Sequence, residues 1–354
     1  MQKLAQPFKS MSNIEYISLG SQKVLIDKIL AKSNHFVIVD SQFFQLHKVF
    51  FTNTSKLFVL ESSEANKTMD TVSKIIEFLQ TNQATKISVL VAIGGGVVGD
   101  IVGFVAAIYM RGLEWINIPT TFLAQVDSSI GGKTAINFAR VKNLIGAFHI
   151  PKQIVIDPSF LVTLSERDWL SGVGEVVKTA LLNQKLYQYL VQHLNGLVLR
   201  DAKVITNIIR QCVDFKDKIT ASDLQDKNLR KVLNLGHTIG HALESFDEFK
   251  LSHGEYVLQG IFVESSLFAE LCDQEYLTQI RDILRKLITT NIQLFPIKIA
   301  ELALLDKKNV DDKIHFIVPK AVGEVTEQRL TKGELIQKLK EFIKNNENFI
   351  YQKF

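Results

Sequence analysis

The sequence ISVLVAI at residues 87–93, followed by GGGVVGD at residues 94–100, indicates the fold of the chain. The first run is apolar and rich in β-branched residues, which is typical of a buried strand. The apolar sequence from Ile101 to Tyr109 has helical character, so the glycines lie in a tight turn between a strand and a helix. Because glycine lets a ligand approach the backbone amides at a helix start, this turn predicts a dinucleotide-binding loop in an α/β domain.

Similar apolar runs lie on both sides of this segment. We expect strands at residues 35–39, 57–60, 115–118 and 153–157, and a helix from about Thr71 to Thr81. Such alternation implies a Rossmann-like parallel sheet covered by helices. After Pro158 the apolar period is near 3.6, with a strand signal at residues 315–318 and an amphipathic surface helix predicted at residues 332–343. We therefore expect an α/β domain at residues 1–158 and a mainly α-helical domain at residues 159–354, with the active site in the cleft between them.

The composition excludes several classes of protein. The 354 residues carry a formal net charge of only +4, and no continuous basic run supports binding of nucleic acid or a membrane surface. Cys212 and Cys272 are the only cysteines, which argues against a disulfide scaffold or a thiolate zinc site. Residues 1–7 lack the apolar core of a signal peptide, and the most apolar stretch, residues 101–110, is too short to cross a bilayer of about 30 Å. We expect a soluble, cytoplasmic protein.

Two histidines one helical turn apart, in HTIGH at residues 237–241, are followed by SHGE at residues 252–255. Positions i and i+4 share one face of a helix, so both imidazoles can reach one ion, and His253 offers a third. This pattern favours a zinc site. A zinc protease of the HExxH type has a glutamate directly after the first histidine. Thr238 stands at that position, which argues against hydrolysis by this route.

A polar segment follows the strand expected at residues 115–118. It reads IPTTFLAQVDSSIGGKTA at residues 118–135 and continues with KNLIG at residues 142–146. So many Gly, Ser, Thr, Asp and Lys residues next to apolar strands indicate a site built from backbone donors and fixed charges. About 20 residues beyond the glycine turn, where dinucleotide-binding domains place a ribose-binding acid, the chain has Pro119, Thr120 and Thr121. The cofactor is therefore expected to bind differently from that of an ordinary dinucleotide-binding domain.

Together with GEVVK at residues 174–178, and in the same order along the chain, these motifs resemble the 3-dehydroquinate synthase family of sugar-phosphate cyclases. The resemblance extends from the first strand to Lys308. It implies a phosphate-eliminating carbon–oxygen lyase of the shikimate pathway, which leads to chorismate and the aromatic amino acids. Its substrate would be 3-deoxy-D-arabino-heptulosonate 7-phosphate and its products 3-dehydroquinate and phosphate. The implied steps are transient oxidation by NAD, phosphate elimination, re-reduction and an intramolecular aldol cyclisation.

The resemblance also assigns roles to individual residues. A Zn²⁺ or Co²⁺ ion would be held by Glu175, His237 and His253, whereas His241 would face the substrate and not the metal. NAD contacts are implied for Glu64, Lys67, Gly95, Gly96, Val97, Asp100, Thr120, Thr121, Asp127, Lys133, Lys142 and Thr163. Substrate contacts are implied for Lys133, Asn143, Lys178, Lys216, Arg230, Asn234, His241 and Lys308, with Lys307 as the alternative to Lys308. Arg111 would reach the active site of a neighbouring subunit, so a homodimer is expected.

The chain departs from the family pattern at two places. Family members carry Thr-Asp-x-Asn after the first strand, whereas this chain has VDSQF at residues 39–43, so an altered cofactor contact is expected there. Arg140 and Val141 precede Lys142, where the family has a glycine beside the lysine. The alternative functions are another NAD- and metal-dependent sugar-phosphate cyclase acting on glucose 6-phosphate, a metal-dependent polyol dehydrogenase, and a binding protein that has lost catalysis. The many candidate anion-binding residues argue against a neutral polyol substrate.

Overall fold

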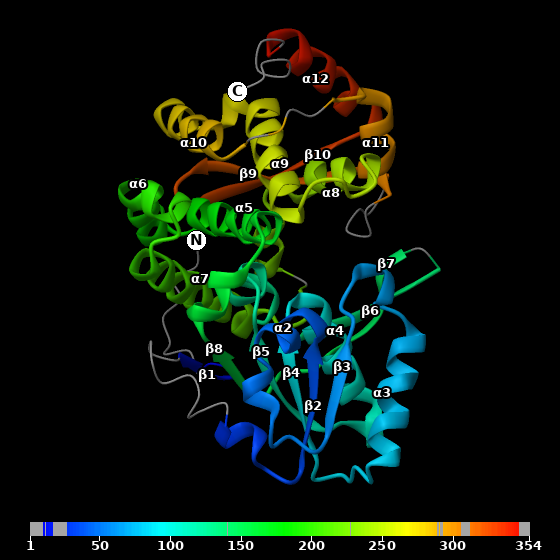
Figure 1. Cartoon of the computed structure of the whole chain (residues 1–354). Coiled ribbons are helices and arrows are strands. Elements are labelled where there is room, and N and C mark those ends of the chain that lie inside the picture. The colour runs from blue at the N-terminus through cyan, green and yellow to red at the C-terminus, as the bar shows by residue number, and fades with distance from the viewer. Residues whose placement is uncertain are drawn as a thin grey trace. The chain divides into compact units, whose positions relative to one another are not determined.

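The computed structural model describes residues 10, 12–16, 27–139, 141–226, 228–288, 290, 293–305 and 312–346. The chain divides into two compact units, one made of Met1–Leu164 and Val213–Asp226 and the other of Ser165–Cys212 and Lys227–Phe354 (Figure 1). The predicted substrate-binding residue Lys308 and its alternative Lys307 lie outside the described residues. None of the described helices combines the length and the apolar character that a membrane crossing requires.

The first unit is built on a six-stranded parallel sheet, which confirms the predicted α/β fold class (Figure 1). Its strands, in spatial order, are β1 (Asn13–Tyr16), β8 (Gln153–Ile156), β5 (Glu114–Pro119), β4 (Val89–Gly94), β2 (His35–Asp40) and β3 (Leu57–Leu60). All the predicted strands of this unit are confirmed. The edge strand β1 was not predicted, because the sequence NIEY holds too few apolar residues to give a strand signal.

The strands β2 and β4 are buried on both faces of the sheet, which explains why their sequences are continuously apolar. In β2, Phe36 and Ile38 belong to one hydrophobic core, and Val37 and Val39 belong to the core on the opposite face. The helices α3 (Met69–Thr81) and α4 (Gly96–Ile108) cover the first face. The second face is covered by α2 (Ser41–Leu46) together with the short helices η1 (Lys48–Phe51) and η5 (Pro158–Thr163). Parallel sheets covered on both sides show this pattern.

The order of the strands places a ligand-binding position at the glycine turn. From β2 the chain moves to β3 on one side, and it then returns to β4 on the other side of β2. The carboxyl ends of β2 and β4 therefore flank a topological switch point, where open α/β sheets bind their ligands. Asp40 ends β2 and Gly94 ends β4, so the glycine-rich turn lies at this position.

The connection from β5 to β8 holds most of the polar segment. It begins with the π-helical turn η4 (Ala124–Ser128) and continues into the antiparallel hairpin of β6 (Lys133–Phe138) and β7 (Val141–Phe148). This hairpin was not predicted, because much of β7 is exposed and polar residues interrupt its apolar pattern. The helix α7 (Ala202–Ser222) belongs to the second unit at its start and to the first unit from Val213 onward.

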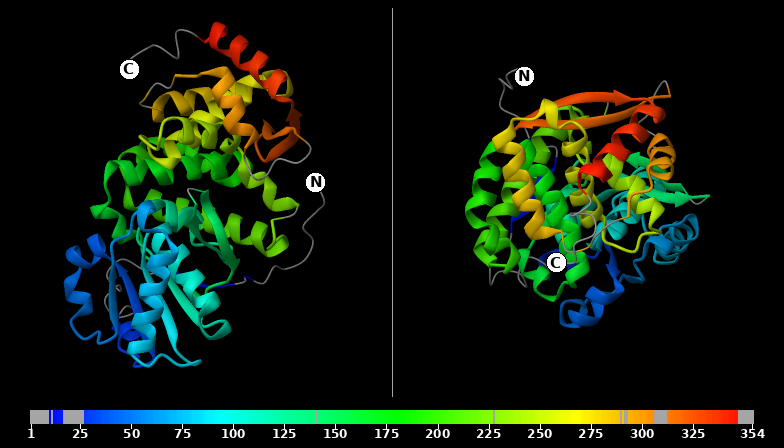
Figure 2. Two further views of the ribbon diagram at one scale, coloured as in Figure 1. Left: turned by 90° about the vertical axis from the view of Figure 1, so that its right-hand side faces the viewer. Right: turned by 90° about the horizontal axis from the view of Figure 1, so that it is seen from above.

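The second unit is mainly helical, as predicted. Its helices are α5 (Glu166–Leu182), α6 (Gln184–Val198), α8 (His237–Phe246), α9 (His253–Leu267), α10 (Gln274–Leu287), α11 (Pro296–Leu304) and α12 (Lys332–Asn345). The strands β9 (Ile314–Ala321) and β10 (Glu324–Leu330) form an antiparallel ribbon, of which β9 was predicted. Figure 2 shows this ribbon in orange and the predicted amphipathic helix α12 in red, close to the yellow helices of the same unit.

Two close helix contacts organise this unit around α9. A Cβ atom on Gly174 of α5 would lie 2.2 Å from the carbonyl oxygen of Gly254 in α9. A Cβ atom on Gly260 of α9 would lie 1.9 Å from the carbonyl oxygen of Gly236, directly before α8. Only glycine permits such approaches. As a result, α9 lies against both α5 and α8, the helices that carry Glu175 and His237.

Candidate metal centre and nucleotide-binding turn

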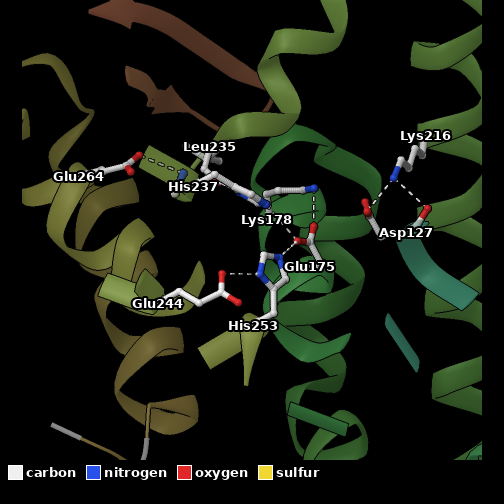
Figure 3. A network of polar contacts seen from close by, with 10 residues as sticks. Asp127, Glu175, Lys178, Lys216, Leu235, His237, Glu244, His253 and Glu264 are labelled. Carbon is white, nitrogen blue, oxygen red and sulfur yellow. Dashed lines mark hydrogen bonds and ion pairs between the residues drawn. The ribbon is translucent and has the colours of Figure 1, made fainter. Parts of the chain in front are cut away.

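Glu175 is the centre of a cluster of ionisable side chains in the second unit. Its side chain is only 2% exposed, and its Oε1 atom lies 3.2 Å from Nε2 of His237 and 3.1 Å from Nε2 of His253 (Figure 3). Each of the three residues offers one ligand atom, and these atoms lie within 4.8 Å of one another. The residues that the sequence resemblance assigned to the metal are thus brought together from α5, α8 and α9.

The local structure fixes where the two histidines stand. His237 and His253 are the first residues of α8 and α9. The start of α9 is held by a capping box, in which the Ser252 side chain and the Glu255 carboxylate satisfy each other's backbone amides. The contact between Gly174 and Gly254 brings this helix start beside the next residue of α5, Glu175.

The second nitrogen of each imidazole has its own partner. Nδ1 of His237 lies 3.0 Å from the carbonyl oxygen of Leu235, and Nδ1 of His253 lies 3.4 Å from Oε2 of Glu244 (Figure 3). With Nδ1 as the donor in both contacts, the Nε2 lone pair of neutral His237, and that of His253 once it has lost its proton, can bind a metal, as in many carboxylate–histidine–metal sites. The sequence analysis gave Glu244 and Leu235 no role, although both lie beside the histidines in the same motif.

The charges around Glu175 keep the carboxylate ionised. Burial alone would raise its pKa, but the Lys178 ammonium and the two histidines hold the pKa of Glu175 well below its usual value. Burial lowers the pKa of His237 to about 4, although the Glu175 carboxylate favours its charged form. Burial also acts to lower the pKa of His253, but hydrogen bonds to Glu175 and Glu244 raise it to about 9.

The donor set fits a divalent metal. One carboxylate and two imidazoles are typical catalytic-zinc ligands, and three protein ligands leave a coordination position for substrate. Lys178 forms an ion pair with Glu175 within α5 and is itself buried. The His241 ring centroid is 5.1 Å from that of His237 and 5.9 Å from that of His253. His241, Glu244 and His253 provide a second, more exposed group of possible ligand atoms.

In the first unit, the glycine turn is shaped for close approach of a ligand. Gly95 is the N-cap of α4, and a Cβ atom there would lie 2.9 Å from the Thr121 side chain. A Cβ atom on Gly96 would lie 2.9 Å from Oγ of Ser128. The turn opens onto a cavity whose lining includes the following residues: Gly95, Gly96, Gly99, Asp100, Asn117, Ser128, Ser129, Gly132 and Lys133. Free amides at a helix start beside such a cavity suit a pyrophosphate.

Lys67 connects the glycine turn to the β6–β7 hairpin. It is buried, and its Nζ atom lies 2.5 Å both from Oδ2 of Asp100 and from Oδ1 of Asn143. The backbone amide of Asn143 donates to Asn137 Oδ1, and the Asn137 amide group donates to Oε1 of Glu64. Residues assigned from sequence to both cofactor and substrate are therefore joined in one network. Burial raises the pKa of Asp100, against the Lys67 ammonium, which favours the charged carboxylate.

Two other predicted lysines of the first unit are paired with carboxylates. Lys216 of α7 donates to the carbonyl oxygen of Asp127 at 2.8 Å and pairs with its carboxylate at 2.7 Å (Figure 3). Asp127 lies in the π-helical turn, a form of helix that often occurs at functional sites. Lys133, at the start of β6, forms an ion pair with Asp226. Asp226 was not predicted, because it stands outside the motifs and lies 93 residues from Lys133 along the chain.

The remaining predicted residues are spread over elements of both units. Val97 is in the first turn of α4, and Lys142 is exposed on β7. The backbone amide of Thr120 donates to the Gly94 carbonyl, and the Thr121 hydroxyl accepts from the Ala124 amide. Thr163 ends η5, where its hydroxyl contacts the carbonyl of Phe160, and Arg230 and Asn234 lie in η6 (Leu229–Asn234) of the second unit.

Two further predictions concern Arg111 and the segment that begins at Asp40. Arg111 is exposed in η3 (Tyr109–Arg111), where Met110 and Arg111 have φ angles of 47° and 63°. The Lys86 ammonium holds this turn by donating to the carbonyls of Met110 and Gly112. Asp40, the altered position after the first predicted strand, accepts from the Phe43 amide at 2.8 Å and from the Ser62 hydroxyl. This carboxylate is therefore used as the N-cap of α2.

Comparisons with known proteins agree with these features. Family models described as 3-dehydroquinate synthase N-terminal and C-terminal match residues 57–171 and 172–309. The 3-dehydroquinate synthase of Alkaliphilus metalliredigens (strain QYMF) is 40% identical over 283 residues, which cover 78% of this chain and 80% of that protein. The same enzyme from Thermoanaerobacter sp. (strain X514) is 34% identical over 341 residues, covering 92% and 95%.

Solved structures share the fold at much lower identity. The 2-epi-5-epi-valiolone synthase of Streptomyces hygroscopicus subsp. jinggangensis 5008, solved with NAD⁺ and Zn²⁺ bound, has a TM-score of 0.84 and 23% identity. The match covers 97% of this chain and 99% of that structure. At this identity the likeness establishes the fold alone.

Proposed function

The chain belongs to the 3-dehydroquinate synthase family, and from this membership we propose that it converts 3-deoxy-D-arabino-heptulosonate 7-phosphate to 3-dehydroquinate and phosphate. The reaction makes the protein a phosphate-eliminating carbon–oxygen lyase of the shikimate pathway. The observation that supports this best is the cluster of Glu175, His237 and His253 in a chain that also carries a glycine turn at the switch point of a parallel sheet. A metal and a dinucleotide together fit a reaction that passes through a transient oxidation.

The proposed cofactors are NAD and a divalent metal, Zn²⁺ or Co²⁺. When bound, NAD takes and returns a hydride, and the metal polarises the oxygen of the hydroxyl that is oxidised. Glu175, His237 and His253 would hold the metal. The pyrophosphate of NAD would lie on the amides of Gly95, Gly96 and Val97, with Asp100 close to its ribose. A Cβ atom at Gly95 or Gly96 would meet the Thr121 or Ser128 side chain, so glycine is needed at both positions, and both residues line the cavity at this turn.

The other cofactor contacts are carried over from the family motifs. We propose that Glu64 and Lys67 contact the adenosine end and that Thr120, Thr121, Asp127, Lys133, Lys142 and Thr163 contact the remainder. Lys67 and Glu64 are linked through Asn137 and Asn143, so these contacts would form on a network that is already connected. A connected network loses less entropy when it orders around a ligand.

The substrate carries a carboxylate and a phosphate, and we propose that cationic and polar side chains recognise both groups. For these anionic groups we propose Lys133, Asn143, Arg230, Asn234 and Lys308, with Lys307 as the alternative to Lys308. Lys178 and Lys216 are proposed to lie near the ring hydroxyls of the substrate, and His241 is proposed to face the substrate. Lys178, Lys216 and Lys133 are each held by a carboxylate of the protein, which fixes their positions before an anion arrives. Charge-assisted hydrogen bonds to prepositioned ammonium groups bind anions most strongly. The substrate anion would compete with these internal partners.

We further propose that the protein acts as a cytoplasmic homodimer in which Arg111 reaches the neighbouring active site. The side chain of Arg111 is exposed on a turn in which Met110 and Arg111 both have left-handed backbone. Strained backbone of this kind is found most often at functional sites, where the surrounding structure holds it in place. Both cysteines are buried thiols, which fits a reducing compartment. Sedimentation of the purified protein, with and without Arg111→Ala, would test the assembly and the contribution of this residue separately.

The substrate proposal is tested by comparing two sugar phosphates. Purified protein with NAD⁺ and Zn²⁺ should release phosphate from the heptulosonate phosphate and not from glucose 6-phosphate. The second compound lacks the carboxylate for which the cationic residues are proposed. Release from glucose 6-phosphate alone would assign the chain to a different cyclase activity, and release from neither compound would remove the proposal.

A further inference from the structure

Helix α8, which begins with the proposed ligand His237, is capped by a side chain from another helix. The carboxylate of Glu264, on α9, accepts from the Gly236 amide at 3.0 Å through Oε2 and from the Ile239 amide at 2.8 Å through Oε1. Glu264 is completely buried. Figure 3 shows its carboxylate directed at the chain beside Leu235 and His237. The two amides belong to the N-cap and N3 positions, so they bracket the histidine.

An ordinary N-cap residue cannot stand before His237. Gly236 has a φ angle of 74°, and a Cβ atom there would lie 2.4 Å from Cγ1 of Ile261 and 3.0 Å from the carbonyl oxygen of Val257. The close approach of α9 therefore excludes the Ser, Thr, Asp or Asn that would usually accept from the N3 amide. In a capping box the N-cap and N3 side chains each satisfy one amide of the helix start. In α8 a single carboxylate from α9 satisfies both.

This arrangement connects the positions of the two histidines. His253 is the first residue of α9, and Glu264 lies three helical turns further along the same helix. The Glu264 carboxylate fixes the backbone on both sides of His237, which sets the direction of its Cα–Cβ bond and hence of the imidazole. Two buried amides would lose their partner if this carboxylate were removed, so the helix start would have to shift to regain hydrogen bonds.

We propose that Glu264 is a positioning residue for metal binding, which sets the start of α8 relative to α9 so that the Nε2 atoms of His237 and His253 face the same carboxylate oxygen of Glu175. The proposal deepens the proposed function, on which it rests, by adding a buried residue that does not itself touch the metal. Partners of this kind commonly change metal affinity by about 10- to 100-fold when they are replaced.

The test measures zinc affinity by competition with a chromophoric chelator for Glu264→Gln and Glu264→Leu. Gln keeps the shape and one acceptor oxygen but presents an amide group to the second backbone donor, whereas Leu removes both acceptors. The control is Glu334→Gln, which removes the charged acceptor from the capping box of α12, a helix that carries none of the proposed ligands. The cobalt-substituted proteins add a second readout, because the absorption of Co²⁺ reports ligand geometry independently of turnover.

We expect zinc affinity to fall about tenfold in Glu264→Gln and further in Glu264→Leu, with an altered Co²⁺ spectrum in both and no change in Glu334→Gln. Unchanged affinity and spectrum in both Glu264 variants would overturn the proposal, as would an equal loss of affinity in Glu334→Gln. Phosphate release by the unmodified protein is measured alongside. Zinc binding that depends on Glu264, in a protein that releases no phosphate, would remove the proposed reaction and leave the positioning role intact.

Discussion

Oε2 of Glu244 lies 3.4 Å from Nδ1 of His253, on the side of the imidazole opposite the nitrogen that faces Glu175. The ring therefore lies between two carboxylates, one of which is a proposed metal ligand. A carboxylate behind a ligating histidine fixes the tautomer and increases the basicity of the nitrogen that binds the metal. The outer carboxylate should thus be needed for metal affinity without contacting the metal.

Replacing Glu244 by Gln is expected to weaken zinc binding by about 10- to 100-fold, because the neutral amide no longer holds the His253 N–H so strongly. Isothermal titration with Zn²⁺ measures this directly. The control is Glu248→Gln, which neutralises an exposed carboxylate shortly after the same helix and should leave the affinity unchanged. Equal affinities of the Glu244 variant and the unmodified protein would contradict this role.

Metal binding should release about one proton per site between pH 7 and pH 8. In the metal-free protein the pKa of His253 is raised to about 9, so this side chain is protonated at neutral pH and must lose its proton to bind a metal. The pKa of His237 is lowered to about 4, and this residue contributes no proton. Affinity is therefore expected to rise with pH over this range, by about tenfold per pH unit.

Titration calorimetry in two buffers of different ionisation enthalpy would count the released protons. The His253→Ala variant should release fewer protons and bind zinc far more weakly. An affinity that does not change with pH between 7 and 8 would show that the His253 proton is not displaced by the metal.

Lys133→Met should reduce kcat/KM for the heptulosonate phosphate by about 10- to 100-fold, since a charged donor to an anion contributes about 1.5–3 kcal/mol. Metal content should stay the same, because Lys133 lies in the first unit and is paired with Asp226. The matched control is Lys152→Met, which removes a lysine that is paired with the exposed carboxylate of Glu114. A similar loss of kcat/KM in both variants would indicate a general effect of charge.

Lys67→Met should weaken NAD⁺ binding and also destabilise the protein. The buried Lys67 ammonium pairs with Asp100 and donates to Asn143. Its loss leaves Asp100 without this cation and Asn143 without this donor. Breaking such a pair costs about 3 kcal/mol. Urea unfolding and NAD⁺ titration measure the two effects. Lys74→Ala, which removes an exposed ion pair with Asp70, should change neither, and an unaltered NAD⁺ affinity in Lys67→Met would contradict its proposed role.

The sequence predicted the parts of the fold that have a strong local signal. Strands such as β2 and β4 are buried on both faces, and their apolar runs identify them without knowledge of the rest of the molecule. The strands β6 and β7 are held by each other and by polar contacts such as that of Asn137 with Glu64, so their sequences lack such a run. The return of Val213–Asp226 to the first unit likewise leaves no local mark in the sequence.

For the candidate site, the family motifs pointed to the residues that are proposed to contact a ligand, but they did not point to the residues that support them. Glu175, His237 and His253 stand in short, distinctive motifs and lie together in the structure. Glu264 and Asp226 stand outside those motifs, and their roles depend on the helix start and the lysine that they contact in the folded chain. Such partners are defined by tertiary contacts, which spacing along a chain does not reveal.

The balance of NADH and phosphate in a single reaction tests the central claim most directly. The protein, Zn²⁺ and a small amount of NAD⁺ are mixed with a large excess of the heptulosonate phosphate, and phosphate, 3-dehydroquinate and absorbance of NADH are followed together. We predict equal amounts of phosphate and 3-dehydroquinate, far exceeding the NAD⁺ supplied, with no lasting NADH. Accumulation of NADH in step with substrate loss, or no phosphate at all, would contradict the account.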